Sequence, residues 1–280
     1  MQYLYYPGCS LEGTAMEYDL STRALFEALG CTLTQIADWT CCGATAAHAM
    51  NALLAHVLPA RNLALAEKMD MGLDILVPCS ACYLNLKTVR QAVETDPDLL
   101  DRVNQVLSEE GLTMTGSLTV RHLLDVLCRD VDTADIAQAS DNCMAGLVIA
   151  PYYGCQCLRP FTEFDDPEQP RSMDAMIQAT GARVLKWDMG SACCGASSPA
   201  TNPETGRVLV GKIVEQAAEA QAIVTVCPMC QMNLERFQSA PVPVLYLPQF
   251  LGLAMGLSPA SVGCGLNLSD VRSFLTRAAL

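Results

Sequence analysis

The feature that most constrains this chain is a series of five cysteines that occurs twice. Cys9 is followed by the adjacent pair Cys41 and Cys42, and then by Cys79 and Cys82 in a C-x2-C motif. A second series repeats this order, including the glycine after the adjacent pair, at offsets of 146, 152 and 148 residues. Its members are Cys155, Cys193, Cys194, Cys227 and Cys230. Because chance does not produce the same five-part series twice, the chain is predicted to be an internal duplication.

The flanking sequence predicts the same α/β unit in each half. Short apolar runs that precede the cysteines read as buried strands, at residues 3–6, 75–77, 147–150 and 222–226. Amphipathic patterns between them predict helices over 18–29, 46–69, 172–180 and 206–220. Strands that alternate with helices indicate a mainly parallel sheet. We therefore expect two similar Rossmann-like α/β domains related by a pseudo-twofold duplication, over residues 1–140 and 141–280.

In such sheets, ligands bind outside the carboxyl ends of the strands. The cysteines follow these predicted strand ends, so each half is expected to gather its five thiols at one edge of its sheet.

Two segments outside the repeat carry their own predictions. Residues 91–142 hold eleven acidic and three basic residues, which indicates a solvated face, with a helix over 118–127 and an exposed linker over 130–142. Residues 237–269 carry no charge, but their most apolar part, 244–257, is shorter than the ~20 residues of a membrane span. We expect a buried C-terminal helix there and no membrane span.

Charge and cysteine usage narrow the function. A net charge of −13 would repel nucleic acid and anionic lipid, which argues against both as main partners. The start of the chain has neither the basic residues nor the apolar run of a signal peptide. A reducing, cytoplasmic location is expected, where clustered cysteines are metal ligands or redox groups more often than disulfides.

Five thiolates in each half exceed the needs of the simplest metal sites. Structural zinc and an ordinary cubane iron–sulfur cluster each take four ligands. A fifth suggests a larger or less regular cluster, or a ligand kept for chemistry. Dithiol–disulfide chemistry at the C-x2-C motifs is a further alternative, and zinc is the less favoured metal.

Five further cysteines lie outside the series, and buried structural thiols are the default reading for them. They are Cys31, Cys128, Cys143, Cys157 and Cys264, of which Cys157 is close enough to Cys155 to compete as a ligand. No phosphate loop, nucleophile triad or dinucleotide fingerprint is present in the sequence, so no catalytic side chain is named.

At these residues the chain resembles a known family. The spacing C-x31-CC-x36-C-x2-C, with x37 and x32 in the second copy, is similar to the cysteine-rich CCG domain. Two such domains in one chain resemble the B subunit of heterodisulfide reductase and its bacterial relatives. The resemblance covers nearly the whole chain, including residues 7–12, 39–45, 153–155, 158–160 and 227–234.

The resemblance implies two noncubane [4Fe-4S] clusters, one held by each cysteine series. In the family, a disulfide substrate is cleaved between the two clusters. Electrons arrive from an iron–sulfur donor protein of the same complex, the C subunit, which is fed by the flavin-containing A subunit. The chain is therefore expected to be an oxidoreductase acting on the heterodisulfide of coenzymes B and M or on a related disulfide.

An alternative function stays open. CCG domains also occur in electron-transfer subunits of 2-hydroxy-acid and other dehydrogenases, which have no substrate of their own, although those chains usually add a ferredoxin-type segment that is absent from this sequence. An anionic substrate would favour nearby basic residues. Arg159, Lys212 and Arg236 are candidates, although a surface or structural role is the simpler reading of each.

Overall fold

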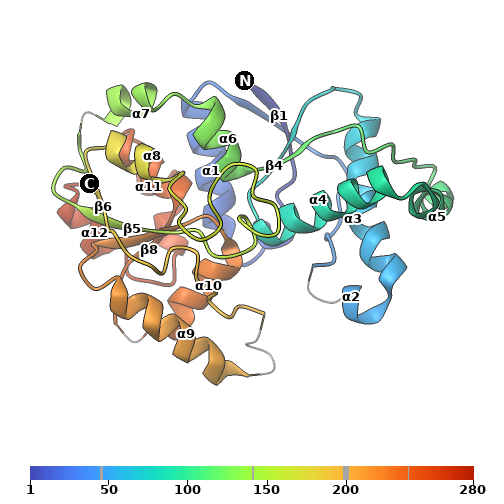
Figure 1. Cartoon of the computed structure of the whole chain (residues 1–280). Coiled ribbons are helices and arrows are strands. Elements are labelled where there is room, and N and C mark those ends of the chain that lie inside the picture. Colours follow the sequence, from blue (N-terminus) through green and yellow to red (C-terminus); the bar gives the residue numbers. More distant parts are fainter. Residues whose placement is uncertain (45–46, 141, 198–201, 239) are drawn as a thin grey trace.

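The computed structural model describes residues 1–44, 47–140, 142–197, 202–238 and 240–280. It contains two four-stranded parallel sheets, with strand orders β2-β1-β3-β4 and β6-β5-β7-β8. Each position in the first sheet has its counterpart in the second, and helices pack around both (Figure 1). The predicted duplicated α/β fold is confirmed.

The first half contains four strands and seven α-helices among the described residues. The strands are β1 (Gln2–Tyr5), β2 (Thr32–Gln35), β3 (Ile75–Val77) and β4 (Val120–His122). The helices are α1 (Met16–Ala28), α2 (Ala47–Met50), α3 (Ala52–Lys68), α4 (Ser80–Thr95), α5 (Pro97–Leu107), α6 (Leu123–Asp130) and α7 (Thr133–Ser140), with a 3-10 turn at Ser108–Glu110.

The second half contains four strands and five α-helices among the described residues. The strands are β5 (Val148–Tyr152), β6 (Arg183–Val184), β7 (Ala222–Thr225) and β8 (Val244–Tyr246). The helices are α8 (Asp174–Ala179), α9 (Pro203–Gln216), α10 (Pro228–Phe237), α11 (Leu247–Ala254) and α12 (Arg272–Arg277), with a 3-10 turn at Cys264–Leu266.

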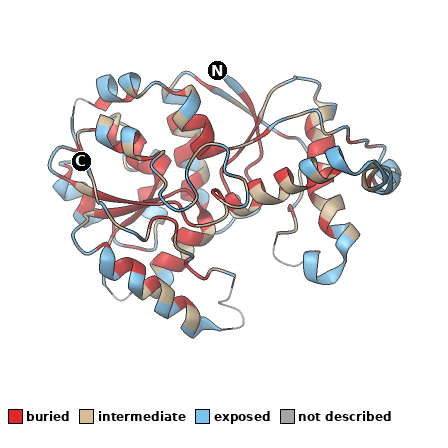
Figure 2. Ribbon diagram, viewed as in Figure 1, coloured by how far each residue is buried: buried red, intermediate tan, exposed pale blue. Residues whose placement is uncertain are grey.

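The central strands form because their apolar residues can be buried on both faces. Every residue of β3 and of β7 is buried, and Figure 2 shows the sheets as the buried interior of the molecule. Runs that are apolar at consecutive positions suit a parallel sheet that helices cover on both sides. This burial explains why short apolar runs were sufficient to locate β1, β3, β5 and β7.

Three sequence predictions are corrected by the structure. The predicted helix over 118–127 begins with strand β4, and the helix α6 starts only at Leu123. The predicted linker over 130–142 contains helix α7, which packs against α8. The predicted C-terminal helix over 244–257 begins with strand β8, although all eight residues of its helical part, α11, are buried as expected.

The helix predicted over 46–69 is divided in two. Asn51 separates α2 from α3, and its side-chain oxygen accepts hydrogen bonds from the backbone N–H groups of Leu53 and Leu54. Such N-caps satisfy the amides at a helix start. Thr45 and Ala46 lie outside the described residues, as does Asp141, where the second domain was predicted to begin. The domain boundary itself stays a prediction.

The two halves are joined by packing as well as by the chain. Helix α1 of the first half packs against α11 of the second, and one hydrophobic core includes residues of both halves. The long loop between β5 and α8 crosses to the first half, where Glu163 forms an ion pair with Lys87 on α4. Phe164 of the same loop lies parallel to the ring of His122 at the end of β4, with centroids 6.3 Å apart.

Candidate metal centres

The parallel sheets bring the cysteines to the expected edges. Cys9 follows β1, and Cys79 follows β3 and occupies the N-cap position of α4. Cys82 lies in the first turn of that helix, whereas Cys41 and Cys42 lie in the loop that follows β2. All five therefore lie beyond the carboxyl ends of parallel strands, where α/β proteins bind ligands.

The first cysteine group consists of Cys9, Cys41, Cys42, Cys79 and Cys82. The sulfurs of Cys42 and Cys82 are 3.3 Å apart, and those of Cys9 and Cys41 are 3.9 Å apart. The Cys82 side chain is also within hydrogen-bonding reach of Cys79, as Cys41 is of Cys42. Contacts between neighbours thus connect all five thiols.

The second cysteine group consists of Cys155, Cys193, Cys194, Cys227 and Cys230. The sulfurs of Cys194 and Cys230 are 3.6 Å apart, which matches the equivalent contact of the first group. Cys155 lies within hydrogen-bonding reach of Cys193, and Cys230 within reach of Cys227. All ten cysteines that the repeat singled out are therefore gathered in two groups, and their role as ligands stays a proposal.

A tight turn shapes each adjacent pair. Gly43 and Gly195 both have φ of +76°, and the backbone N–H of each donates to the first sulfur of its pair at 3.4 Å. A side chain at these positions would be strained by the backbone angle and would collide with Leu58 or Leu209. The glycine after each cysteine pair is thus required by the turn.

A second pair of glycines lies directly against the thiols. A Cβ on Gly8 would come within 2.8 Å of the Cys82 sulfur, and one on Gly154 would come within 2.7 Å of the Cys230 sulfur. Both glycines also have positive φ angles, of +74° and +69°. Each half therefore has a glycine, which carries no side chain, where a cysteine sulfur packs against the backbone.

Two asparagines that the sequence analysis did not identify hold the cysteine turns in place. The Asn85 amide donates to the Cys42 carbonyl at 3.1 Å, and the Asn233 amide donates to the Cys194 carbonyl at 2.6 Å. Each asparagine lies three residues after the last cysteine of its series. The repeated pattern C-x2-C-x2-N-L was the signal that could have revealed them.

Two tyrosines support the residues just before the adjacent pairs. The Tyr6 hydroxyl donates to the Thr40 carbonyl at 2.6 Å, and the Tyr152 hydroxyl donates to the Ala192 carbonyl at the same distance. These tyrosines belong to the repeated flanks of the first cysteine of each series, so their recurrence was visible in the sequence although their role was not.

Exposure differs systematically within each group. Cys9, Cys41 and Cys193 are exposed and Cys155 is partly so, whereas the remaining six members are buried. Each group is consequently anchored in the protein on one side and open to solvent on the side of its first two cysteines.

Hydrogen bonds favour a thiolate at the second cysteine of each adjacent pair. Bonds from Cys41 and Cys82 lower the pKa of Cys42 to about 4. A bond from Cys230 likewise lowers the pKa of Cys194. The thiolate is the form of cysteine that binds metal.

The donor set consists of thiols, which are the ligands that iron–sulfur clusters use. Within the described residues, no three His, Cys, Asp or Glu side chains are placed to hold one metal ion. The ligands of a multi-iron cluster are distributed over several irons, so their sulfurs need not converge on one point. Five thiols in each group also exceed the four that zinc accepts.

The two groups approach one another at the interface between the halves. The Tyr18 hydroxyl lies 3.1 Å from the Pro78 carbonyl and 3.0 Å from the Val226 carbonyl. These residues immediately precede Cys79 and Cys227. One buried hydroxyl thus connects the strand ends that carry a cysteine of each group.

Of the five cysteines outside the series, Cys31, Cys157 and Cys264 are buried as expected, whereas Cys128 is partly exposed and Cys143 is exposed. Cys157 is fully buried and its thiol donates to the Tyr153 carbonyl at 3.2 Å. Of the three basic candidates, Arg159 pairs with Glu168 at 2.9 Å, Arg236 lies over the Phe237 ring, and Lys212 is exposed on α9.

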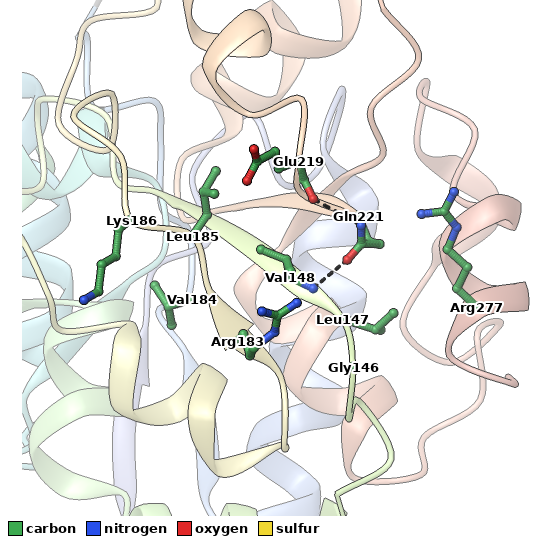
Figure 3. Close-up of a pocket in the computed structure, with 10 residues that line it drawn as sticks. All are labelled: Gly146, Leu147, Val148, Arg183, Val184, Leu185, Lys186, Glu219, Gln221 and Arg277. Carbon is green, nitrogen blue, oxygen red and sulfur yellow. Dashed lines mark hydrogen bonds between the residues drawn. The ribbon is translucent and has the colours of Figure 1, made fainter.

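A pocket elsewhere in the second half does not belong to the cysteine site. It lies where β5 and β6 begin, and Figure 3 shows Arg183, Lys186 and Arg277 along its wall. The Gln221 amide accepts a hydrogen bond from the Val148 N–H at 2.6 Å and so closes one side of it. This is the amino edge of the sheet, opposite to the edge that carries the cysteines.

Comparison with known proteins identifies the repeated unit. The model of the CCG family, described as a cysteine-rich domain, matches residues 3–87 and again residues 149–235. The chain belongs to the CCG family. Both matches contain a complete cysteine group.

Relatives that match most of this CCG protein are named as subunits of oxidoreductases or as similar to such a subunit. The chain is 33% identical to the 8-methylmenaquinol:fumarate reductase membrane anchor subunit of Wolinella succinogenes, over 96% of this chain and 97% of that protein. It is 28% identical to a protein of Archaeoglobus profundus that is named as similar to the B subunit of heterodisulfide reductase, over 94% and 93% of the two chains. It is 30% identical to the B subunit of the ferredoxin/F(420)H(2)-dependent CoB-CoM heterodisulfide reductase of Methanosarcina acetivorans, over 79% and 77%.

A solved structure shares the fold. A hypothetical protein from Helicobacter pylori matches 96% of this chain and 52% of its own with a TM-score of 0.75 and 13% identity. The family and the relatives together indicate an iron–sulfur, redox-related component of an oxidoreductase complex, similar to the B subunit of heterodisulfide reductase. Among the described residues, no helix has the length and apolar character needed to cross a membrane.

Proposed function

We propose that this CCG protein is the disulfide-reducing component of a heterodisulfide reductase-like complex. Each cysteine group would hold one noncubane [4Fe-4S] cluster, with all five of its thiols as ligands. The observation that supports the proposal is that one hydroxyl, that of Tyr18, contacts the backbone carbonyl directly before a cysteine of each of the two equivalent groups. The cytoplasmic location expected from the sequence remains a prediction.

Disulfide reduction needs two electrons, and release as two thiols needs two protons. When bound, iron–sulfur clusters would supply the electrons and a place for each sulfur. The protein contributes two matched sites, each open to solvent beside Cys9 and Cys41 or beside Cys155 and Cys193. A disulfide that contacts both sites is the substrate class that we propose, with protons supplied by solvent.

The proposed clusters give up their electrons to the disulfide and must be reduced again in each turnover. These electrons are expected to come from partner proteins. We expect an iron–sulfur donor protein similar to the C subunit of heterodisulfide reductase, which a flavin protein similar to the A subunit would supply. The family relatives named as parts of larger enzymes support such an assembly.

A second function is favoured by one comparison. The relative from Wolinella succinogenes is named as part of a fumarate reductase, and it matches nearly the full length of this chain. By that analogy, the chain would pass electrons between partner proteins without a substrate of its own. The same cysteine groups would then hold the clusters but would not bind a disulfide.

The first experiment determines iron, acid-labile sulfide and zinc in anaerobically purified protein, with electron paramagnetic resonance spectra of the same sample. We expect about eight irons and a matching amount of sulfide. One or two zinc ions without sulfide would contradict the cluster proposal. About four irons would mean a single cluster and would exclude cleavage between two.

The second experiment separates the two functions. Chemically reduced protein is mixed with the CoB-CoM heterodisulfide and with simpler disulfides, and the thiols formed are counted. We expect thiol formation that is lost in Cys41→Ala and Cys193→Ala but kept in the control Cys264→Ala, which removes a buried cysteine outside both groups. Fully loaded protein that reduces no disulfide but exchanges electrons with a quinol-linked partner would favour the second function.

A further inference from the structure

The outer edge of the second sheet lies in a groove that the cysteine site does not use. β6 is the last strand in the order β6-β5-β7-β8, so one of its two edges has no neighbouring strand in this sheet. Two cavities, of about 550 Å³ and about 1170 Å³, adjoin the strand. Both are lined by Val184, Leu185, Lys186 and Glu219, so together they form one continuous groove.

The groove follows the sheet edge from one end of the strand to the other. It begins at the amino edge of the sheet, beside Gly146 and Arg277 (Figure 3). Further along it is lined by residues of α8 and of the end of α9. It ends at Gly190 and Ser191, and Ser191 lies two residues before Cys193. A molecule that filled the groove would therefore reach the loop that carries the second adjacent cysteine pair.

The backbone of β6 offers hydrogen bonds to such a molecule. The Arg183 N–H donates to the Leu147 carbonyl at 2.8 Å. The Leu185 N–H donates to the Ile149 carbonyl at the same distance. Successive residues of a strand present their N–H and C=O groups to opposite sides, so those of Val184 face away from β5. An extended peptide can pair with an edge of this kind, with main-chain hydrogen bonds that supply affinity.

Opposite charges gather at the two ends of the groove. The smaller cavity is lined by three basic residues and one acidic residue, whereas the larger is lined by five acidic and two basic residues. Several of these charges form no ion pair within the described part of the chain, namely Arg183, Lys186, Arg277, Asp188 and Glu215. They suit an occupant with carboxylates at one end and ammonium groups at the other.

The matching edge of the first half is built differently. A cavity of about 390 Å³ at that edge takes only Gln35 from β2, and its lining includes two acidic residues and no basic one. The Gln35 side chain accepts from Arg23 at 2.7 Å and donates to Glu12 at 3.4 Å. The two halves therefore share the sheet but differ in the groove.

We propose that an extended segment of a partner protein binds in this groove and adds to β6 as a further strand of the second sheet. Its acidic side chains face Arg183 and Arg277, and its basic side chains face Asp188 and Glu215. The inference rests on the proposed function only in that the chain works with partner proteins. It requires neither a cluster nor a disulfide.

Synthetic peptides test this proposal on the full chain. The probe is a Val-Thr-Val run with glutamates at one end and lysines at the other, made in both orders because strands pair in either direction. Fluorescence anisotropy measures its binding, and hydrogen exchange followed by mass spectrometry reports on the amides of residues 183–187. We expect one order to bind and to slow exchange in this segment. A peptide with proline in place of the threonine is the control, because proline has no N–H to donate.

A matched pair of proline variants locates the peptide. Val184→Pro removes the N–H that faces the groove, and an edge strand tolerates proline at such a position. We expect the affinity for the peptide to fall about tenfold, which corresponds to the loss of about one hydrogen bond. Leu33→Pro is the control, because Leu33 occupies the equivalent position on β2. It should bind the peptide as the wild type does.

Charge reversal provides a second route, because Arg183→Glu and Arg277→Glu leave the backbone of the groove unchanged. Both should weaken binding of the peptide. If neither order of the peptide binds, the charges beside β6 only guard the edge against association, and the inference is overturned. Equal binding by the wild type and by all the variants would also overturn it, since the peptide would then bind elsewhere. Wild-type protein without iron and sulfide would overturn the proposed clusters but would leave the peptide result unchanged.

Discussion

The ring of Tyr18 stacks on the ring of Tyr246, with centroids 3.9 Å apart and planes within 4° of parallel. Tyr18 lies on α1 of the first half and Tyr246 ends β8 of the second. Both are buried, and the Tyr18 hydroxyl donates to the carbonyls that precede Cys79 and Cys227. The stack therefore fixes the relative position of the two cysteine groups.

Removal of the Tyr18 hydroxyl should weaken the junction of the halves. Tyr18→Phe keeps the stacked ring but leaves two buried carbonyls without this donor, and we expect the free energy of unfolding to fall by about 1–3 kcal/mol. Tyr18→Leu also loses the ring stack and should cost more. Anaerobic urea unfolding followed by circular dichroism measures both. Equal stability of Tyr18→Phe and the wild type would show that the hydroxyl does not stabilise the interface.

Substitution of Gly8 should damage the first site specifically. A Cβ at Gly8 would press on the Cys82 sulfur, so Gly8→Ala is expected to lose much of the iron of the first group while the second keeps its own. Gly30→Ala is the matched control. Gly30 also has a positive φ, of +67°, and would suffer the same backbone strain of about 1–2 kcal/mol, but its Cβ would meet no atom within 4 Å. Iron loss of similar size in both variants would attribute the effect to the backbone and not to Cys82.

The two asparagines should support metal binding without touching metal. Asn85→Ala frees the turn at Cys42, and Asn233→Ala frees the turn at Cys194. Loss of a hydrogen-bond partner of this kind typically lowers metal affinity about 10–100-fold. Each variant should therefore release the iron of its own half to a chelator faster than the wild type does. Asn104→Ala is the control, because Asn104 makes comparable hydrogen bonds to Met114, outside both groups. An unchanged rate of iron release in both site variants would show that the two asparagines do not support metal binding.

The stability of the fold should depend on the protonation of His122. Its pKa is about 3 in the folded protein, below the usual value of 6.5, so the unfolded chain binds more protons between these limits. The contribution of neutral His122 to the free energy of unfolding is complete above pH 6.5. It is lost as the pH falls, by about 2 kcal/mol between pH 7 and pH 5.

His122→Phe should remove this part of the pH dependence. The measurement compares the unfolding free energy of variant and wild type at the two pH values, so that titration common to both proteins cancels. If the difference in unfolding free energy between variant and wild type did not change with pH, His122 would not be held neutral by the fold.

The repeat predicted the fold more reliably than local patterns did. The central strands were located because each is a buried apolar run directly before a cysteine or its turn. The edge strands β2 and β6 were missed, since they are partly exposed and acquire their pairing only from β1 and β5.

The errors at β4 and β8 have one physical cause. In both halves the fourth strand passes into the next helix without an intervening turn, at His122 and at Tyr246. An apolar run that crosses this junction has no local feature that separates strand from helix, because the strand exists only by pairing with β3 or β7.

The composition of each cysteine group was predictable, and the repeat also marks Asn85, but the hydrogen-bond partners of Asn85 and Ser80 were not predictable. Asn85 and Ser80 act through hydrogen bonds to residues that are distant in sequence, and the partner of Ser80 lies in the other half. A polar side chain in an apolar run shows no such partner until the chain has folded.

The packing of α1 on α11 has a consequence for how such a chain could arise. A single copy of the repeated unit would leave apolar helix faces uncovered, and a second identical copy related by a twofold axis is the simplest surface to cover them. Fusion of such a homodimer through one linker would give a chain with this duplicated organisation. Fusion then allows the two copies to diverge. Ser80 follows Cys79 in one copy and Pro228 follows Cys227 in the other, at positions that symmetry would have kept identical.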